Sequence, residues 1–323
     1  MILLGHEEAW REWRSAIGRG RMHHGWILAG RKGMGKATFA DAAARELLAA
    51  GGSAWSDPLN HPDILELQPL PDSDDEERKR AEGKPFKVKR NISVDQVRVL
   101  QKRLNTRPTL GERRAVIVDA ADDLERGAAN ALLKSLEEPP TGTMFLLVAH
   151  RIGRLQATIR SRCRVLRFPE LSDAEVGGVL DAEPGLSADV RAAALAMAGG
   201  SPGAALDFAA RDLTAAFGLM LRILDGGDSD FALRGALLGE IGQRPDRDQQ
   251  LAVIEAARMI VANAAATADR ASAARMIEAH AVLARLLAQA PTANFDPTTL
   301  MLQIGGLLAS VAADREEIGR AHV

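Results

Sequence analysis

The chain contains 323 residues, of which 46% are hydrophobic and 26% are charged. This composition is that of a packed globular protein and excludes disordered and membrane-embedded classes, and the length favours two or three domains over one core. The 41 basic and 43 acidic residues give a net charge of −2, so no overall field draws the chain towards nucleic acid or anionic lipid.

Cysteine content and the lack of targeting signals indicate a reducing compartment. The single cysteine, Cys163, excludes an internal disulfide framework and a zinc site built from several cysteines. The first turns carry Glu7, Glu8 and Arg11 in place of an apolar signal segment, and no later run of about 18 apolar residues suggests a membrane span. We therefore expect a cytoplasmic protein without membrane contact.

Five short apolar runs, separated by helix-like stretches, occupy the first half of the chain. They lie at residues 26–29, 64–67, 115–118, 145–148 and 164–168. Continuous apolar runs that alternate with helices are typical of a buried parallel sheet. The sequence therefore predicts an α/β domain over residues 1–169.

The segment GRKGMGK at 30–36 follows the first run and opens a helix. It has the G-x-x-x-x-G-K spacing of a P-loop, in which backbone N–H groups around Gly30, Gly33 and Gly35 surround a phosphate and Lys36 reaches the terminal phosphates. The pattern predicts a P-loop and leaves open whether ATP or ADP is still bound.

Two positions of this pattern lack groups that ATP hydrolysis needs. The hydroxyl that should follow the lysine and bind Mg²⁺ is replaced by Ala37, and Thr38, one residue on, points elsewhere on the helix. Asp119 ends the third apolar run, where a carboxylate binds Mg²⁺ through water, but the next residue, Ala120, has no proton-accepting group. We therefore expect a degenerate nucleotide site that does not hydrolyse ATP.

Asp122 and Asp123 follow closely and allow two interpretations. They start the next helix as an N-terminal cap, which is the favoured interpretation, or one of them replaces the missing base. The helix that they precede should end at Pro139-Pro140.

Residues 68–90 are rich in proline and in blocks of both charge signs. Such a composition is typical of an exposed, mobile insertion. A solvated loop is the favoured interpretation over a binding arm, and the sequence does not say whether the segment touches DNA or a partner.

After residue 168 the strand pattern ends and alanine- and leucine-rich helical patterns follow. Ser172 with Glu175 forms a capping-box pattern that opens the first of these helices, as Ser93 with Gln96 does earlier in the chain. Glycine-rich stretches at 199–203 and 225–229 punctuate this region. We expect a small helical domain over 170–211 and a larger all-α domain over 212–323.

The segment SRC at 161–163 ends a short helical stretch before the last apolar run, which leaves Arg162 at an edge of the sheet. An arginine there could act in trans on a neighbouring subunit's γ-phosphate, although a plain surface arginine is the simpler interpretation. His23, His24 and His61 have neither cysteine partners nor the spacing of a helix-borne ligand pair, so we expect structural roles for them and no bound metal.

These motifs resemble the clamp-loader subunits of bacterial DNA polymerase III, and among them the delta-prime type. The resemblance spans most of the chain and rests on the P-loop segment, HPD at 61–63, ISVDQVR at 92–98, AANALLKSLEEPP at 128–140, SRC, and GGSPGAAL at 199–206. It implies an AAA+ module, made of the α/β domain and a helical lid at 170–211, followed by a collar (oligomerisation) domain at 212–323.

The resemblance also implies a role for single residues. Delta-prime subunits lack a working ATPase and lend the arginine of SRC, here Arg162, to ATP bound by a gamma/tau subunit. The lid arginine that senses nucleotide in motor subunits would fall at or beside Gly203, where no arginine stands. The zinc-binding cysteines usual in this family are absent from residues 49–60, so no zinc is expected.

We therefore expect a component of the DNA polymerase III holoenzyme that requires no cofactor of its own. It would be a non-hydrolysing stator in a hetero-pentamer with gamma/tau and delta subunits, and would reach the beta sliding clamp and primed DNA through that complex. The alternative is an ATP-hydrolysing motor of the gamma/tau type that uses Lys36, Asp119 and a relocated base such as Asp122. An unrelated P-loop protein that binds DNA alone is disfavoured by the near-neutral charge.

Overall fold

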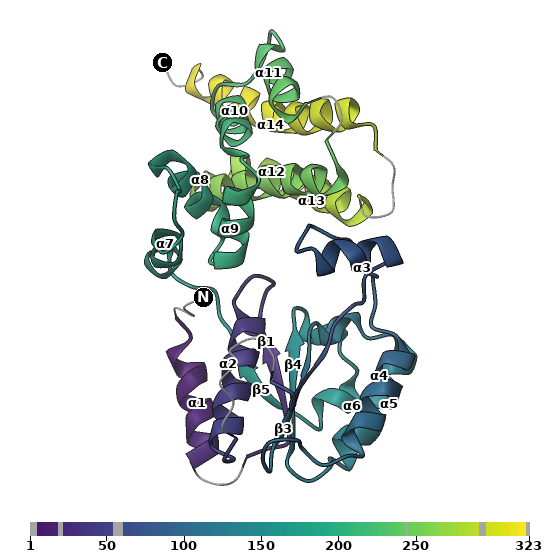
Figure 1. Cartoon of the computed structure of the whole chain (residues 1–323). Coiled ribbons are helices and arrows are strands. Elements are labelled where there is room, and N and C mark those ends of the chain that lie inside the picture. Colours follow the sequence, from purple (N-terminus) through teal and green to yellow (C-terminus); the bar gives the residue numbers. More distant parts are fainter. Residues whose placement is uncertain (1–4, 19–21, 54–60, 243–244, 291–294, 321–323) are drawn as a thin grey trace. The chain divides into compact units, whose positions relative to one another are not determined.

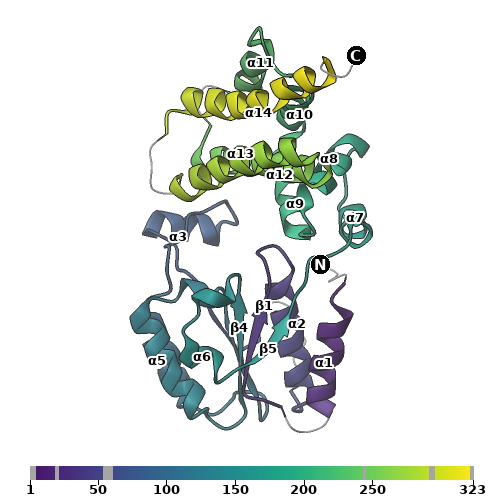
Figure 2. The same cartoon turned by 180° about the vertical axis from the view of Figure 1, so that it is seen from behind.

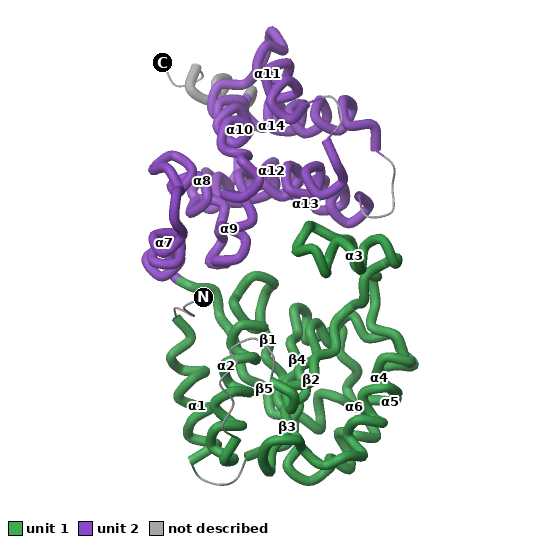
Figure 3. Tube along the Cα trace, in the orientation of Figure 1, with its two compact units in different colours: residues 1–171 green, residues 172–323 purple. Residues whose placement is uncertain are grey.

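The computed structural model describes residues 5–18, 22–53, 61–242, 245–290 and 295–320. The chain divides into two compact units, Met1–Leu171 and Ser172–Val323 (Figure 3). The first unit combines strands and helices, and in the part of the second that the structure describes every regular element is a helix.

The first unit is built around a five-stranded parallel sheet (Figure 1). Its strands are β1 (Gly25–Ala29), β2 (Ile64–Leu67), β3 (Arg114–Val118), β4 (Thr143–Ala149) and β5 (Arg164–Arg167). Their order across the sheet is β2-β3-β4-β1-β5, and every residue of the three inner strands is buried. The predicted strands and the parallel sheet are confirmed.

Helices cover both faces of this sheet (Figures 1 and 2). On one face lie α1 (Glu7–Gly18) and α2 (Lys36–Ala49), and on the other lie α4 (Val94–Leu104), α5 (Arg126–Glu137) and the short α6 (Ala157–Arg160). A parallel sheet enclosed in this way is the P-loop α/β architecture, so the predicted fold class is confirmed.

Each face of β1 packs into its own apolar core. On the α1 and α2 side, Trp13 meets Trp26 edge-on at 5.5 Å, and Phe39 meets Phe168 at 5.0 Å. Ile27, the next residue along β1, points to the opposite face and joins an aliphatic core with α4, α5 and α6. These two cores hold the carboxyl end of β1, and thus the start of the P-loop, in place.

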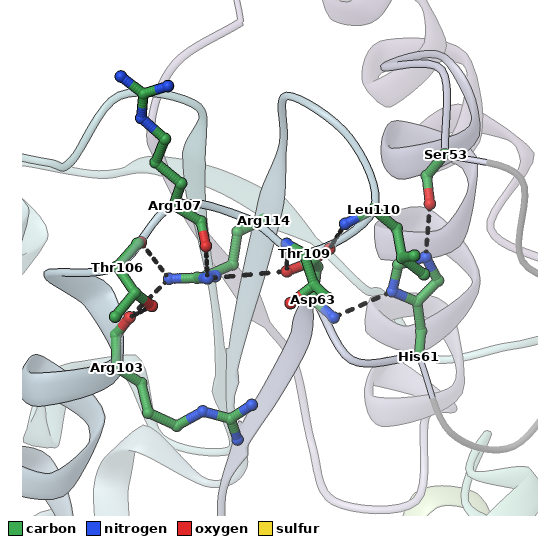
Figure 4. A network of polar contacts seen from close by, with 9 residues as sticks. All are labelled: Ser53, His61, Asp63, Arg103, Thr106, Arg107, Thr109, Leu110 and Arg114. Atoms are coloured by element: carbon green, nitrogen blue, oxygen red, sulfur yellow. Dashed lines mark hydrogen bonds and ion pairs between the residues drawn. The ribbon is translucent and has the colours of Figure 1, made fainter.

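A buried polar network surrounds the HPD motif (Figure 4). Asp63 is fully buried, and its carboxylate accepts the N–H groups of Thr109 at 2.7 Å and Leu110 at 2.9 Å. His61 accepts the N–H of Asp63 on Nδ1 and shares a 2.9 Å hydrogen bond with the Ser53 hydroxyl through Nε2. The structural role expected for His61 is therefore confirmed.

Arg114, the first residue of β3, completes the network. Its guanidinium lies 3.7 Å from the Asp63 carboxylate and is 5% exposed. It donates hydrogen bonds to three backbone carbonyls at the carboxyl end of α4, those of Arg103, Thr106 and Arg107. The network joins β2, β3 and the end of α4 through groups that would be costly to bury unpaired.

The insertion at residues 68–90 is largely exposed, as expected, but it contains a helix, so the expectation that it is a loop is wrong. The helix α3 (Asp74–Ala81) begins after Ser73, whose hydroxyl accepts the N–H of Glu76. Its first turn is acidic and its last turn is basic, which suits the helix dipole. Three ion pairs link residues three apart along it, and such pairs stabilise an exposed helix.

The two legs of this insertion pair with each other. Pro71 and Val88 form an antiparallel bridge, flanked by backbone hydrogen bonds from Asp72 to Lys87 at 3.0 Å and from Lys89 to Leu70 at 2.7 Å. Figures 1 and 2 show α3 held away from the sheet by these extended legs.

The helices of the second unit are α7 (Asp173–Asp181), α8 (Ala188–Ala198), α9 (Pro202–Ala210), α10 (Thr214–Gly226), α11 (Ala232–Ile241), α12 (Arg247–Thr267), α13 (Arg270–Gln289) and α14 (Pro297–Arg320). The capping box at Ser172 that opens α7 is confirmed, as is the one at Ser93 that opens α4. α12 and α13 form a helical hairpin, and α14 packs against α10, α11 and α13.

Within this unit α7, α8 and α9 pack on one another, and α8 also contacts α10 and α12. The division into a lid at 170–211 and a collar at 212–323 stays a prediction. No described helix combines the length and the apolar character that crossing a bilayer requires.

Candidate nucleotide site and exposed arginine

Three adjacent strands bring the candidate residues together at one edge of the sheet. The P-loop follows β1 and Asp119 follows β3, while β4, which lies between them, ends next to His150. Carboxyl ends of parallel strands meet at the same edge, where α/β proteins bind their ligands. The structure therefore groups Lys36 and Asp119, as the sequence predicted, and adds His150.

The glycines of the P-loop have the conformations that a phosphate cradle requires. Gly33 and Gly35 take positive φ values of 83° and 74°, which side chains disfavour. A Cβ on Gly30 would collide with the carbonyl oxygen of Phe168, so only glycine fits there. The loop opens directly into α2, whose first N–H groups are free to face an anion. These residues fit a bound phosphate.

Lys36 is buried, with 2% of its surface exposed. Its ammonium donates a hydrogen bond to the backbone carbonyl of Arg31, within the same loop. Burial lowers the pKa of Lys36 to about 8, although the carboxylates of Asp119 and Asp122 act in the opposite direction. Among the described residues, Asp119, Asp122 and the Arg31 carbonyl thus compensate the charge of a lysine that lies in a largely dehydrated site.

The position that should supply a hydroxyl to Mg²⁺ holds Ala37, which is exposed at the start of α2. Thr38 lies one residue further along the helix and is half-buried. Successive helical residues point about 100° apart, so Thr38 does not present its hydroxyl where the residue after the lysine would. The loop fits a phosphate, whereas this side of the site does not fit a hydrolytic metal.

Asp119 lies directly after β3, and its N–H donates to the carbonyl of Leu67 at 2.9 Å. Burial raises the pKa of the Asp119 carboxyl, and the nearby charges of His150 and Lys36 lower it in part. The following residue, Ala120, is 4% exposed and offers no group to activate water. The carboxylate is therefore present without the base that hydrolysis needs.

Asp122 does not cap a helix, so the favoured interpretation of this residue is wrong. Its carboxylate accepts the N–H of His150 at 2.9 Å and that of Arg151 at 2.7 Å. α5 begins only at Arg126, with Glu125 at its N-cap, because residues Ala121–Asp123 form a separate 3₁₀ turn. Asp122 instead fastens the turn after β3 to the loop after β4.

His150 is the site residue that the sequence analysis missed. Burial lowers the pKa of its imidazole, and the charge of Lys36 lowers it further. Its Nδ1 is buried and has no hydrogen-bond partner among the described residues. The available signal was its place directly after the fourth apolar run, the same relation that Asp119 has to the third.

Arg162 lies at the other end of the strands from the P-loop. It precedes β5, whose residue Arg164 pairs with Trp26 near the start of β1, whereas the P-loop follows the end of β1. β5 is an edge strand, and its two terminal residues are exposed. Arg162 is thus remote from the chain's own Lys36.

Glu137, Thr158 and Ser161 contact the Arg162 side chain, which is 37% exposed. Its Nη2 lies 2.7 Å from a carboxylate oxygen of Glu137, the last residue of α5. Its Nη1 donates to the carbonyl of Thr158 at 3.0 Å. Burial raises the pKa of the adjacent Cys163 thiol to about 12, which leaves it a poor nucleophile.

Among the described residues, no group of three or more histidines, cysteines, aspartates and glutamates is arranged to hold a metal ion. Residues 54–60, part of the segment from which zinc-binding cysteines are absent, lie outside the described chain.

Sequence and structure comparisons identify relatives. The chain is 35% identical to the DNA polymerase III subunit delta' of Escherichia coli over 198 residues, which cover 58% of this chain and 54% of that protein. The delta' subunit of Pseudomonas aeruginosa is also 35% identical, over 59% of this chain and 57% of the relative. The chain thus matches a little over half the length of these relatives.

A crystal structure of a DNA polymerase III gamma subunit-related protein from Thermotoga maritima has the same fold. It superimposes with a TM-score of 0.54 and covers 93% of this chain and 99% of that one, at 17% identity. The family model described as DNA polymerase III, delta subunit, matches residues 5–172, which is half of the chain. These matches confirm the resemblance drawn from the motifs, and the protein belongs to the DNA polymerase III delta-subunit family.

Proposed function

We propose that the protein is a non-hydrolysing, delta-prime-like subunit of a DNA polymerase III clamp loader. In this role it works with gamma/tau and delta subunits, in the cytoplasm, to place a sliding clamp on primed DNA. It contributes no ATPase activity of its own and needs neither zinc nor another cofactor, although its P-loop retains the shape to hold ATP or ADP.

The observation that carries the proposal is the missing base after β3. Ala120 stands next to Asp119, and the nearest substitute, Asp122, already accepts two backbone hydrogen bonds. A carboxylate held by the backbone in this way is a poor general base, because it is not free to turn towards an attacking water. Ala37 adds a second defect on the metal side of the site. The alternative of a gamma/tau-type motor is therefore disfavoured.

The position of Arg162 supports its action on a neighbour. Since the P-loop and Arg162 lie at opposite ends of β1 and β5, this arginine cannot reach a phosphate bound at Lys36. It lies beside an exposed edge strand, and in the proposed complex the nucleotide of another subunit would lie next to it. There a guanidinium would stabilise the charge that develops on a transferring phosphoryl group, an effect of about three to five powers of ten in rate.

The test compares two arginines of the same segment. The isolated chain should show no ATP turnover, with or without primed DNA. In a complex reconstituted with gamma/tau and delta subunits, Arg162→Ala should slow single-turnover hydrolysis at the adjoining site by about three powers of ten. Arg160→Ala removes a neighbouring exposed arginine from α6 and should leave the rate unchanged.

Two results would refute the proposal. DNA-stimulated turnover by the isolated chain, abolished by Lys36→Ala, would make it a motor. If Arg162→Ala and Arg160→Ala both had small and equal effects on the hydrolysis rate, Arg162 would be an ordinary surface arginine without a role at the adjoining site.

A further inference from the structure

Among the described residues, the charged side chains of the insertion at 68–90 form ion pairs within α3 but mostly do not in the segment that follows it. Every cation of α3 is paired: Arg78 with Asp75, Lys79 with Glu76, and Arg80 with Glu77. The returning leg, residues 84–90, carries four cations and no acidic residue. Lys84 pairs with Glu82, and the Glu76 carboxylate accepts the backbone N–H of Lys87 at 2.6 Å and interacts with its charge. No ion pair within the described chain holds the side chains of Lys87, Lys89 or Arg90.

Exposed apolar side chains lie among these cations. Phe86 is 41% exposed and Val88 is 50% exposed, and Leu70 on the opposite leg is 43% exposed. Because the legs are extended and paired, Phe86 and Val88 fall on one face of the returning leg while Lys87 and Lys89 fall on the other. The leg thus has an apolar face with an aromatic ring, and the side chains of Lys87 and Lys89 extend from its opposite face.

Protection of the exposed leg against pairing with other chains explains only part of this pattern. Lysines on an exposed strand prevent pairing with other chains, which would account for Lys87 and Lys89. The same purpose would remove large apolar side chains from the surface, yet Phe86 stays exposed in the middle of the basic segment. The combination indicates a ligand that offers both negative charge and a flat apolar surface.

We infer that the returning leg, residues 84–90, is a binding site for single-stranded nucleic acid. Lys87 and Lys89 contact successive phosphates from one face of the leg, Arg90 contacts a further phosphate, and Phe86 stacks on an unpaired base from the other face. Lys87 and Lys89 lie about 6.6 Å apart along an extended segment, a spacing comparable to that of phosphates along an extended strand. Basic grooves with interleaved aromatic rings bind single strands without sequence preference.

The exposed ring selects the single strand over a duplex. In a duplex the faces of the bases are stacked on one another, so Phe86 would find no partner there. An acidic peptide would satisfy the cations but would not need the ring. The site uses no residue of the nucleotide-binding edge or of the SRC segment, so it stands independently of the proposed function.

Fluorescence anisotropy with the full-length chain tests this inference. The probes are a labelled 20-nucleotide oligothymidylate and a duplex of the same length, each at 50 and 200 mM salt. The test variant replaces Lys87, Lys89 and Arg90 with glutamine. The matched control replaces Arg78, Lys79 and Arg80, which removes the same charge from the paired cations of α3.

We expect the single strand to bind more tightly than the duplex. With about three phosphate contacts, its affinity should fall about twentyfold between the two salt concentrations. The test variant should lose more than tenfold in affinity and the control variant less than threefold. Phe86→Leu keeps an apolar side chain but loses the ring, and should weaken single-strand binding about fivefold or more.

Several results would overturn the inference. Equal losses in the two triple variants would mean that only net charge matters. Equal affinity for duplex, or an unchanged affinity in Phe86→Leu, would exclude base stacking. If polyglutamate displaced the labelled probe as well as unlabelled oligothymidylate does, the leg would be a binding site for an acidic peptide. Absence of binding at 50 mM salt would refute the site, and circular dichroism would verify that each variant retains its helices.

Discussion

Replacing Lys36 with methionine should stabilise the first unit at neutral pH. Lys36 is 2% exposed, and burial lowers its pKa from 10.5 to about 8. At pH 7 the amine is charged in both the folded and the unfolded chain, so the folded state bears the full cost of a dehydrated charge. A shift of this size corresponds to about 3 kcal/mol, at about 1.4 kcal/mol for each pKa unit.

Methionine keeps most of the side chain's apolar length but loses the hydrogen bond to the Arg31 carbonyl. That bond contributes about 1 kcal/mol. The free energy of unfolding of Lys36→Met should therefore exceed that of the wild type by about 2 kcal/mol at pH 7. Lys32→Met, in the same loop but exposed, should change it by less than about 0.5 kcal/mol.

The stability difference between Lys36→Met and the wild type should decrease as the pH rises. Below pH 8 both states of the wild type bind the proton on Lys36 and the cost is fully present. Between pH 8 and 10.5 the unfolded chain binds more protons than the folded chain, so the stability of the wild type rises relative to Lys36→Met. The advantage of the variant should therefore shrink across this interval and disappear above it.

Urea denaturation followed by tryptophan fluorescence measures this difference. All four tryptophans, at positions 10, 13, 26 and 55, belong to the first unit, so the signal reports on that unit alone. A less stable Lys36→Met variant at pH 7, or an advantage that stays constant from pH 8 to 10.5, would refute the reasoning about the buried ammonium.

Three further predictions concern stability and reactivity. Arg114→Met should lower the free energy of unfolding, measured in urea, by about 3 to 5 kcal/mol, since it leaves the fully buried Asp63 without its cation. A loss below about 1 kcal/mol would mean that the backbone N–H groups alone stabilise the Asp63 carboxylate. Gly30→Ala should lower the stability by about 1 to 3 kcal/mol and reduce Tm, because its Cβ collides with the Phe168 carbonyl; an unchanged Tm would contradict this close approach. Cys163, whose pKa burial raises to about 12, should react with a maleimide at pH 8 about a hundredfold more slowly in the folded chain than in urea; similar rates in both states would show the thiol to be accessible and ionisable.

Local sequence patterns were sufficient where the physical cause is itself local. The apolar runs predicted the strands because inner parallel strands are buried on both faces. The capping boxes at Ser93 and Ser172 marked helix starts because their partners lie three residues away. The helix in the insertion could not be predicted, because proline and mixed charge suggest a loop, whereas ion pairs along α3 and pairing of the two legs order the segment.

Local sequence was sufficient to identify the P-loop, the lack of a hydroxyl at Ala37 and of a base at Ala120, and the family. Each of these depends on residue type at a fixed spacing along the chain. The tertiary structure decided the rest. Asp122 binds backbone groups of the loop after β4, and Arg162 lies at the opposite end of the strands from Lys36 and pairs with Glu137. These relations join segments far apart in sequence, and only the order of the strands in the sheet brings such segments together or keeps them apart.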